Sequence, residues 1–329
     1  MPQLSQAQYG KDNIRVYKVH RDPKTGTQDV VEFTVCVLLS GDIESSYGPT
    51  CHSRNDVLIS HSYTEADNSV VVATDSMKQT TYILAKQHPV NPPELFGAIV
   101  ANHFVTKYSH IHRAQVKVKQ HRWARLTVDE KPHPHSFFRD SAETRNAEVV
   151  ATDSEGIMVK SALSGLLVLK STGSAFHGFI HDEYTALKDV EDRILSTEVD
   201  SRWTWDTFKS LQDVETSLTK FDNAWQIARE ITLRLFAIEN SPSVQNTMYK
   251  MCDEILKAVP EVNVVDYSLP NKHYFEIGEC GRRRYFGGAR LMTFPDMSWH
   301  QGLKNTGEDA EVYAPQSDPN GLIQCTVTR

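Results

Sequence analysis

The feature that most constrains this chain is an order of predicted elements that occurs twice. In each half of the 329 residues, strand patterns frame a pair of helical patterns. Strands that frame paired helices indicate antiparallel sheets with helices on one face, rather than a doubly wound parallel sheet. The sequence therefore predicts an α+β protein with two tandem domains, residues 1–151 and 152–329.

The predicted elements of the first half begin at residue 14. Alternating or β-branched patterns predict strands at residues 14–19, 30–39, 70–73, 116–128, 136–140 and 148–151. Apolar residues at helical spacing predict helices at residues 76–86 and 94–108. Pro and Gly residues predict turns at 22–26 and 131–135.

The second half repeats this order with one addition. Strands are expected at residues 157–161, 165–171, 263–268, 273–277 and 322–327. Helices are expected at residues 183–195, 222–239 and 244–259, and the first of them has no counterpart in the first half. Four-stranded sheets have open edges, so we expect the halves to pair into a larger sheet that a homo-oligomer closes into a barrel.

Composition excludes several classes of protein. A net charge of −7 with 23% charged residues is typical of an ordinary protein surface and gives no case for nucleic-acid binding. No apolar run approaches the length of a membrane span. The five cysteines lack metal-ligand spacing and favour a reducing compartment without a disulfide framework. Two histidine pairs, His110 with His112 and His133 with His135, have no third ligand at suitable spacing, so no metal is expected.

Thr74 and Asp75 stand where a predicted helix begins, directly after an apolar run. The amides of a first helical turn point at any ligand bound there, so a hydroxyl and a carboxylate at this place suit ligand binding. The same side chains also suit a simple helix cap. Lys11, in the segment Tyr9-Gly-Lys-Asp12, reads on its own as a solvated charge.

A second helix start carries Val244 and Gln245, in the segment Ser243-Val-Gln-Asn-Thr247. The amide of a glutamine offers an acceptor and a donor pair, so it binds the edge of a cyclic amide with two hydrogen bonds. The alternative is that Gln245 helps to cap the helix. The sequence leaves both interpretations open.

Arg193 and Phe176 are candidates for holding a flat ligand. The planar fork of an arginine matches a planar anion, whereas an arginine in this position also pairs readily with Asp192 or Glu191. Phe176 lies between glycines in a predicted loop, which favours a stacking role over a place in the core.

Asn271 and His273 follow a proline at a predicted strand start. A histidine there is commonly a hydrogen-bonded structural residue. Placed beside Lys11 and Thr74, His273 would instead complete a relay that moves protons near neutral pH.

Taken together, these residues make the chain similar to the urate oxidase (uricase) family, above all its fungal members. The stretches that carry the resemblance run in order along almost the whole chain. They are Tyr9-Gly-Lys-Asp-Asn13, Ala73-Thr-Asp-Ser76, Lys131-Pro-His-Pro-His-Ser136, Arg193-Ile-Leu-Ser-Thr197, Ser243-Val-Gln245, Thr247-Met-Tyr-Lys-Met251, Tyr267-Ser-Leu-Pro-Asn-Lys-His-Tyr-Phe-Glu-Ile277 and Ala314-Pro-Gln-Ser-Asp-Pro-Asn-Gly-Leu-Ile323.

The resemblance implies two tandem tunnelling-fold (T-fold) domains and a homotetramer that encloses a β-barrel tunnel, with active sites at subunit interfaces. It also implies cofactor-free oxidation of urate by dioxygen and water to 5-hydroxyisourate and hydrogen peroxide, as part of purine degradation.

The same resemblance implies roles for nine residues of this chain. Arg193 and Gln245 would grip urate, Phe176 would stack on it and the Val244 amide would bond one oxygen. Thr74 and Asp75 would come from a neighbouring subunit. Lys11, Thr74 and His273 would relay protons, and Asn271 would hold dioxygen or water above the ring.

The chain departs from the family pattern at residues 48–63 and 278–295, which read as insertions: either surface loops or translated introns. The family also implies a peroxisomal location. This chain ends Cys325-Thr-Val-Thr-Arg329 in place of the Ser-Lys-Leu signal common in the family, and a cytoplasmic location is then the alternative.

Two other interpretations stay open. A related T-fold enzyme acting on a pterin or another purine would use a glutamate as ring anchor, often with a metal. A urate- or pterin-binding T-fold protein without oxidase activity would result if the two insertions disrupt the site or the tetramer.

Overall fold

One eight-stranded antiparallel sheet runs through both halves of the chain, in the order β1-β2-β3-β6-β7-β8-β9-β10. The computed structural model describes residue 4 and residues 6–41, 60–139, 141–277 and 302–329. Its main strands are β1 (Tyr9–Arg21), β2 (Gln28–Gly41), β3 (Ile111–His121), β6 (Thr144–Thr152), β7 (Gly156–Lys170), β8 (Leu195–Trp205), β9 (Val262–Glu276) and β10 (Tyr313–Thr328).

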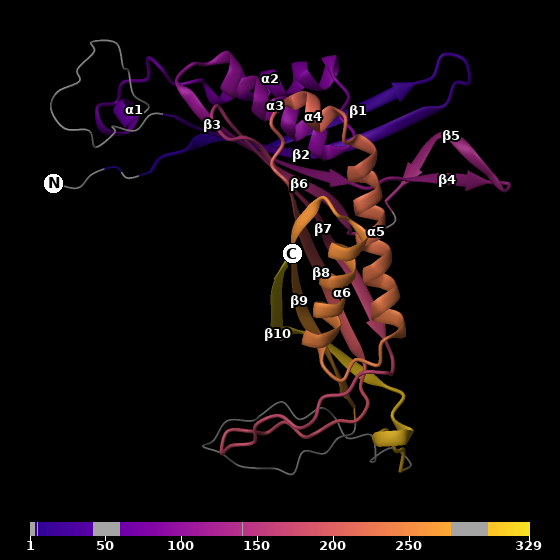
Figure 1. Ribbon diagram of the computed structural model, residues 1–329. Helices are drawn as coiled ribbons and strands as arrows, with labels where there is room; N and C mark the ends of the chain where they lie inside the picture. Colours follow the sequence, from indigo (N-terminus) through magenta and orange to yellow (C-terminus); the bar gives the residue numbers. More distant parts are fainter. Residues whose placement is uncertain (1–3, 5, 42–59, 140, 278–301) are drawn as a thin grey trace.

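Two pairs of long helices accompany the sheet (Figure 1). They are α2 (Thr74–Gln87) and α3 (Pro93–Lys107) in the first half, and α5 (Leu218–Ile238) and α6 (Val244–Ala258) in the second. The shorter helices are α1 (Ser60–Thr64), α4 (Leu211–Glu215) and the 3-10 turn η2 (Gly307–Asp309). Each half therefore has the predicted order of hairpin, two helices and two further strands. Within the described residues, no helix is long and apolar enough to cross a membrane.

The core lies between the sheet and these helices. On β2 the alternate side chains Phe33, Val35, Val37 and Leu39 are fully buried, while the residues between them are only partly buried. This period-two pattern is typical of a sheet with one covered face. Helix α3 is buried around most of its circumference, because it packs on β3, β6 and β7 together.

The pairing of β6 with β7 joins the two halves into a single sheet, as the open edges of each half predicted. Arg145 on β6 strengthens this junction. Its guanidinium donates to Glu94 of α3 at 2.9 Å and to Asp222 of α5 at 2.6 Å. Glu94 is fully buried and also accepts from Ser161 of β7 at 2.7 Å. One buried ionic cluster thus connects helices from both halves.

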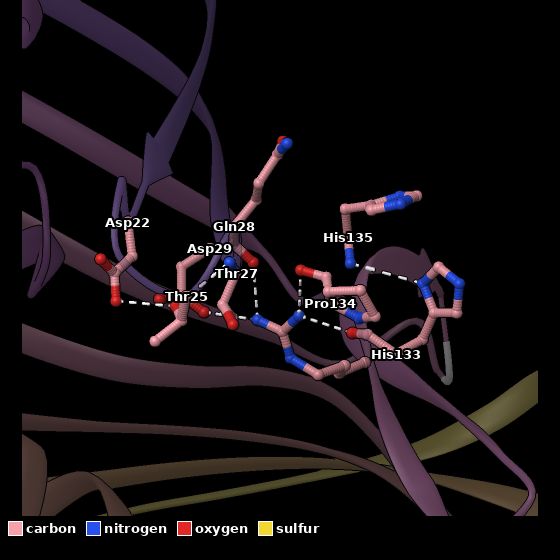
Figure 2. A network of polar contacts seen from close by, with 9 residues as sticks. Asp22, Thr25, Thr27, Gln28, Asp29, His133, Pro134 and His135 are labelled. Carbon is pink, nitrogen blue, oxygen red and sulfur yellow. Dashed lines mark hydrogen bonds and ion pairs between the residues drawn. The ribbon is translucent and has the colours of Figure 1, made fainter.

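A separate hairpin, β4 (Ala124–Val128) with β5 (Lys131–Phe138), projects from the main sheet (Figure 1). Arg125 fastens it to the start of β2, since its guanidinium donates to the Gln28 carbonyl and the Asp29 carboxylate at 2.6 Å. The same group donates to the carbonyls of His133 and Pro134 within the hairpin at 2.8 and 2.9 Å. Figure 2 shows Gln28 and Asp29 on one side of this network and His133 and Pro134 on the other.

Three first-half predictions are wrong in detail. Residues 70–73 are irregular and not a strand. The strand predicted at 116–128 is interrupted between β3 and β4. The stretch 131–135 belongs to strand β5, since the turn is made by Asp129 and Glu130, both in the left-handed region. Prolines are tolerated in β5 because it belongs to a two-stranded sheet with free edges.

The largest error falls on residues 183–195, which form no helix. Residues 183–194 belong to an extended loop, 171–194, and residue 195 begins β8. Residues 157–161 and 165–170, expected in two separate strands, lie on the single strand β7, whose partner is β8. Gly165 has φ +74° inside β7, at a register irregularity with β8.

Strand β9 also corrects a prediction, because it runs unbroken through Pro270 where two strands, 263–268 and 273–277, were expected. Of the two predicted insertions, residues 48–59 and 278–295 lie outside the described residues. The last part of the first one, residues 60–63, lies in α1.

Candidate functional site

Arg193 provides an unpaired positive charge beside an aromatic ring. Its guanidinium carbon lies 5.1 Å from the ring centroid of Phe176, within cation–π range. Its Nε atom is buried without a hydrogen-bond partner, and burial lowers the pKa of the group. Among the described residues no carboxylate lies within ion-pair distance of it. A half-buried cation without a counter-ion is suited to an anionic ligand.

Asp192, the expected alternative partner of Arg193, is engaged elsewhere. Its carboxylate accepts hydrogen bonds from the Gly173 amide at 2.8 Å, the Ser174 amide at 3.3 Å and the Thr172 hydroxyl. These bonds lower the pKa of Asp192, led by the one from Thr172. The two ends of the 171–194 loop are thereby closed on each other, and the Arg193 amide donates to the Ser174 carbonyl at 2.8 Å.

The same loop is tied to the start of α6. The Ala175 amide donates to the Ser241 carbonyl at 3.0 Å, and the Ser241 amide donates to the Gly173 carbonyl at 3.0 Å. The Ser241 hydroxyl in turn accepts from Lys170 at 2.8 Å and from Thr247 at 3.0 Å. This network of hydrogen bonds holds the 171–194 loop beside the N-terminus of α6.

Val244 and Gln245 are the first two residues of α6. The N-cap is Ser243, whose hydroxyl oxygen accepts from the Asn246 amide at 3.4 Å, so Gln245 does not cap the helix. The Ser243 hydroxyl donates to the Gln245 side-chain carbonyl at 3.0 Å. The Val244 side chain is buried, while the Gln245 side chain is exposed and its amide nitrogen has no partner in the described part of the chain.

His273 and Asn271 lie on β9, where the pairing with β10 shifts register between Gln316 and Gly321. Such irregularities re-aim side chains, and they are frequent beside active sites. Burial lowers the pKa of His273, and the positive charge of Arg193 lowers it further. The ring of His273 is therefore neutral at neutral pH and able to accept a proton.

Lys11 lies at a matching irregularity in β1, where the pairing with β2 shifts between Lys11 and Ile14. The preceding Gly10 permits a very close backbone approach, because a Cβ there would lie 1.8 Å from the Val37 carbonyl oxygen. Nearby, the Val72 amide donates to the Tyr9 hydroxyl at 3.0 Å and holds the segment before α2 against β1.

Thr74 and Asp75 occupy the exposed first turn of α2. The N-cap is Ala73 and no side chain caps this end, so the simple cap interpretation is wrong. The first intrahelical bond joins the Met77 amide to the Ala73 carbonyl at 3.1 Å, and the amides before it face outward. A bond from Lys78 lowers the pKa of Asp75, and the charge of Lys11 adds to this effect.

The predicted site residues thus form two groups that one chain does not bring together. Phe176, Arg193, Val244, Gln245, Asn271 and His273 belong to the second half, and Lys11, Thr74 and Asp75 to the first. Strands β1 and β9 are six steps apart in the sheet, roughly 29 Å at 4.8 Å a step. In Figure 1, β1 and α2 lie in the upper part of the view and the 171–194 loop at the bottom.

In the described part of the chain, neither histidine pair belongs to a group of three metal ligands. His112 binds Asp153 at 2.6 Å, and the rings of His133 and His135 meet edge to face at 4.6 Å. Over the described ranges, no group of three His, Cys, Asp or Glu side chains is placed to hold a metal ion.

The residues that position the site are not marked by any local sequence pattern. Lys170, Ser241 and Thr247 are buried or half-buried polar residues at the ends of β7 and α6, and Tyr9 holds the segment before α2. A signal for β8 was present, because every second residue from Leu195 to Trp205 is buried and four of these six, Leu195, Val199, Trp203 and Trp205, are apolar. A period of two over eleven residues predicts a strand.

An antiparallel sheet with a helix pair in each half defines a tunnelling-fold protein. The uricase family model matches residues 7–150 and 159–324. The chain is 56% identical to a uricase of Aspergillus flavus and 55% identical to one of Emericella nidulans, over all of this chain and 98% of each relative. The crystal structure of uricase from Arthrobacter globiformis matches with a TM-score of 0.79 and 30% identity, over 100% of this chain and 96% of that one. The chain belongs to the uricase family.

Proposed function

We propose that this protein is a urate oxidase that converts urate, dioxygen and water to 5-hydroxyisourate and hydrogen peroxide without a cofactor. The observation that carries the proposal is the half-buried Arg193 guanidinium, which lies over the Phe176 ring and has no counter-ion among the residues that the structure describes. Urate is a planar anion. The planar guanidinium of Arg193 complements its charge, and the Phe176 ring complements its flat shape.

The binding roles follow from the chemistry of each group. Arg193 gives two parallel donors to one edge of the anion, and Gln245 gives a donor and an acceptor to the adjoining amide edge. Phe176 stacks on the ring, and the outward amide of Val244 at the start of α6 donates to an oxygen. These groups orient the ring and favour its deprotonated, electron-rich form, which can give an electron to dioxygen.

Proton movement falls to Lys11, Thr74 and His273. A neutral His273 accepts a proton, the Thr74 hydroxyl both donates and accepts, and the Lys11 ammonium donates. Asn271, which directly flanks the register shift between β9 and β10, holds dioxygen or water above the ring.

The site requires a second copy of the chain. Strands β1 and β10 are the two open edges of the sheet. If β1 of one copy pairs with β10 of another, Lys11 comes within two strand steps of β9, about 10 Å. Thr74 and Asp75 then come from the neighbouring subunit. Pairing at both edges closes two sheets into a barrel, and two such rings make a homotetramer.

The direct test is the loss of urate absorbance in air by the purified protein, with peroxide release and the mass in solution measured on the same sample. We expect turnover at tetramer mass, and none with Arg193→Gln. Urate binding without peroxide release would support the alternative, a T-fold binding protein that residues 48–63 and 278–295 have made inactive. Turnover of a pterin in place of urate would support the other T-fold enzymes.

Subunit complementation tests the shared site. Thr74→Ala and Arg193→Gln chains should each be inactive alone. Co-expressed at equal levels, they should recover about a quarter of the wild-type activity, because a quarter of shared sites receive an intact half from each chain. Sites built within a single chain would give no recovery at all.

A further inference from the structure

Two thiols from distant parts of the sequence meet beside the open edge of the sheet. The Sγ atoms of Cys252 on α6 and Cys325 on β10 are 3.6 Å apart, although 73 positions separate them. Both are free thiols; Cys252 is buried and Cys325 is partly exposed. A disulfide joins sulfur atoms about 2.05 Å apart, so a relative movement of roughly 1.5 Å would bring them to bonding distance.

The location allows such a movement. Strand β10 is an edge strand, paired only with β9, and Cys325 lies near its end. Cys252 is fixed in the core, where its thiol also approaches the Val265 carbonyl at 3.8 Å. Because Cys325 meets α6 through its side chain, a bond to Cys252 leaves the backbone edge of β10 available for pairing with another copy.

The oxidant comes from the reaction proposed above, on which this step rests. Hydrogen peroxide oxidises one thiol to a sulfenic acid and releases water. The second thiol then attacks that sulfur, and a second water leaves as the disulfide forms. Two electrons and two protons pass from the thiols to one peroxide, which becomes two waters. Burial raises the pKa of both thiols, so the oxidation is slow and follows sustained exposure rather than single turnovers.

We infer that Cys252 and Cys325 form a peroxide-driven disulfide that fastens the edge strand β10 to helix α6. The bond would join two residues that are 73 positions apart in the chain. It would restrain β10 and, through it, the segment of β9 that carries Asn271 and His273. Its expected consequence is a higher melting temperature of the oxidised protein, which a reductant reverses.

The test uses the full-length protein, reduced and freed of reductant, in three arms: added hydrogen peroxide, urate in air, and buffer. Free thiols are then blocked with N-ethylmaleimide and the protein is digested without reduction. We expect a peptide linking Cys252 to Cys325, two hydrogens lighter than its parts, in both oxidised arms. A link in the added-peroxide arm alone would uphold the cysteine pair and count against the proposed oxidase.

Matched variants make the outcome specific. Cys36→Ser should leave the linked peptide and the rise in melting temperature unchanged, whereas Cys325→Ser, at the more exposed position, should abolish both. Sulfinic acids on unlinked cysteines, unchanged thiols after prolonged peroxide, or links to other cysteines instead would overturn the inference.

Discussion

The carboxylate of Asp192 accepts hydrogen bonds from the backbone amides of Gly173 and Ser174 and does not pair with the guanidinium of Arg193, its neighbour in the chain, which has no counter-ion in the described part of the structure. Asp192 therefore positions the loop and keeps Arg193 available for a ligand. An acidic residue beside an arginine is more often its partner, so this division of roles depends on the fold of the 171–194 loop.

Replacing Asp192 should weaken substrate binding more than it slows the chemical step. We expect Asp192→Ala to raise the KM for urate about tenfold, the equivalent of one charge-assisted hydrogen bond of about 1.5 kcal/mol. Asp192→Asn should recover part of this, since its side-chain oxygen can still accept the Gly173 amide. Asp189→Ala is the control, because Asp189 accepts the Gly178 amide at 2.9 Å in the same loop. Equal effects of the two alanine variants would contradict a specific role for Asp192.

Substitution of Arg193 by lysine should show how much of its effect on urate turnover comes from the positive charge and how much from the planar guanidinium. Arg193→Lys keeps the positive charge but loses the planar fork, and we expect kcat/KM for urate to fall about a hundredfold. Arg202→Lys, at an exposed arginine on β8, should change kcat/KM little. An Arg193→Lys enzyme with normal kcat/KM would show that charge alone suffices.

The pKa of His273 should respond to Arg193. In the native protein it lies below the ordinary value of 6.5, and NMR titration of the ring should show this directly. Arg193→Gln removes a nearby positive charge and should raise the pKa toward 6.5, although burial still opposes protonation. His121, whose pKa is lowered by burial in the first half, should not move. A fall or no change at His273 would contradict the proximity of the two groups.

The same shift sets the direction of one pH effect on stability. Because the folded-state pKa of His273 lies below the unfolded one, the unfolded chain binds more protons between the two values. The contribution of His273 is fully present above about pH 6.5, the unfolded value, and is lost as the pH falls through the folded pKa. Urea unfolding at several pH values should show a smaller loss on acidification in His273→Asn than in the native protein.

The ionic cluster at the junction of the halves should matter for stability. Arg145→Met leaves Glu94 fully buried without its cation, and we expect a loss of about 3–5 kcal/mol in the free energy of unfolding. Arg234→Met breaks the exposed pair with Glu254 and should cost no more than about 1 kcal/mol. Combining Glu94→Leu with Arg145→Met should restore part of the loss. A double variant less stable than Arg145→Met would mean that the cluster acts through packing and not through charge.

Local sequence patterns predicted the four long helices to within a few residues. Helix α6 illustrates why, since Met248, Met251, Cys252 and Ile255 recur at helical spacing on its buried face and Ser243 caps its start. The prediction failed at residues 183–195, where Tyr184 and Leu187 are largely exposed and no apolar face packs on the sheet. Helix propensity without a surface to pack on does not sustain a helix.

The site itself was predicted by resemblance rather than by pattern. Local patterns left Arg193 with three possible partners and Gln245 with two roles, and the positions of Lys170, Ser241 and Tyr9 gave no signal at all. Contacts such as Tyr9 with the Val72 amide join residues more than sixty positions apart, and nothing local encodes them.

By itself, the sequence determined the α+β class, the repeated order of elements and the membership of the family, because periodicity, caps and family motifs are local and are read directly along the chain. Only the tertiary structure decided that β6 and β7 are the strands that join the halves, and that Arg193 lies over Phe176 without a counter-ion among the described residues. It also decided that Cys252 meets Cys325, and that Lys11 lies far from His273 within a chain. The reason is physical: strand order and loop closure are set by packing between distant segments, which bury a shared core that no single segment contains.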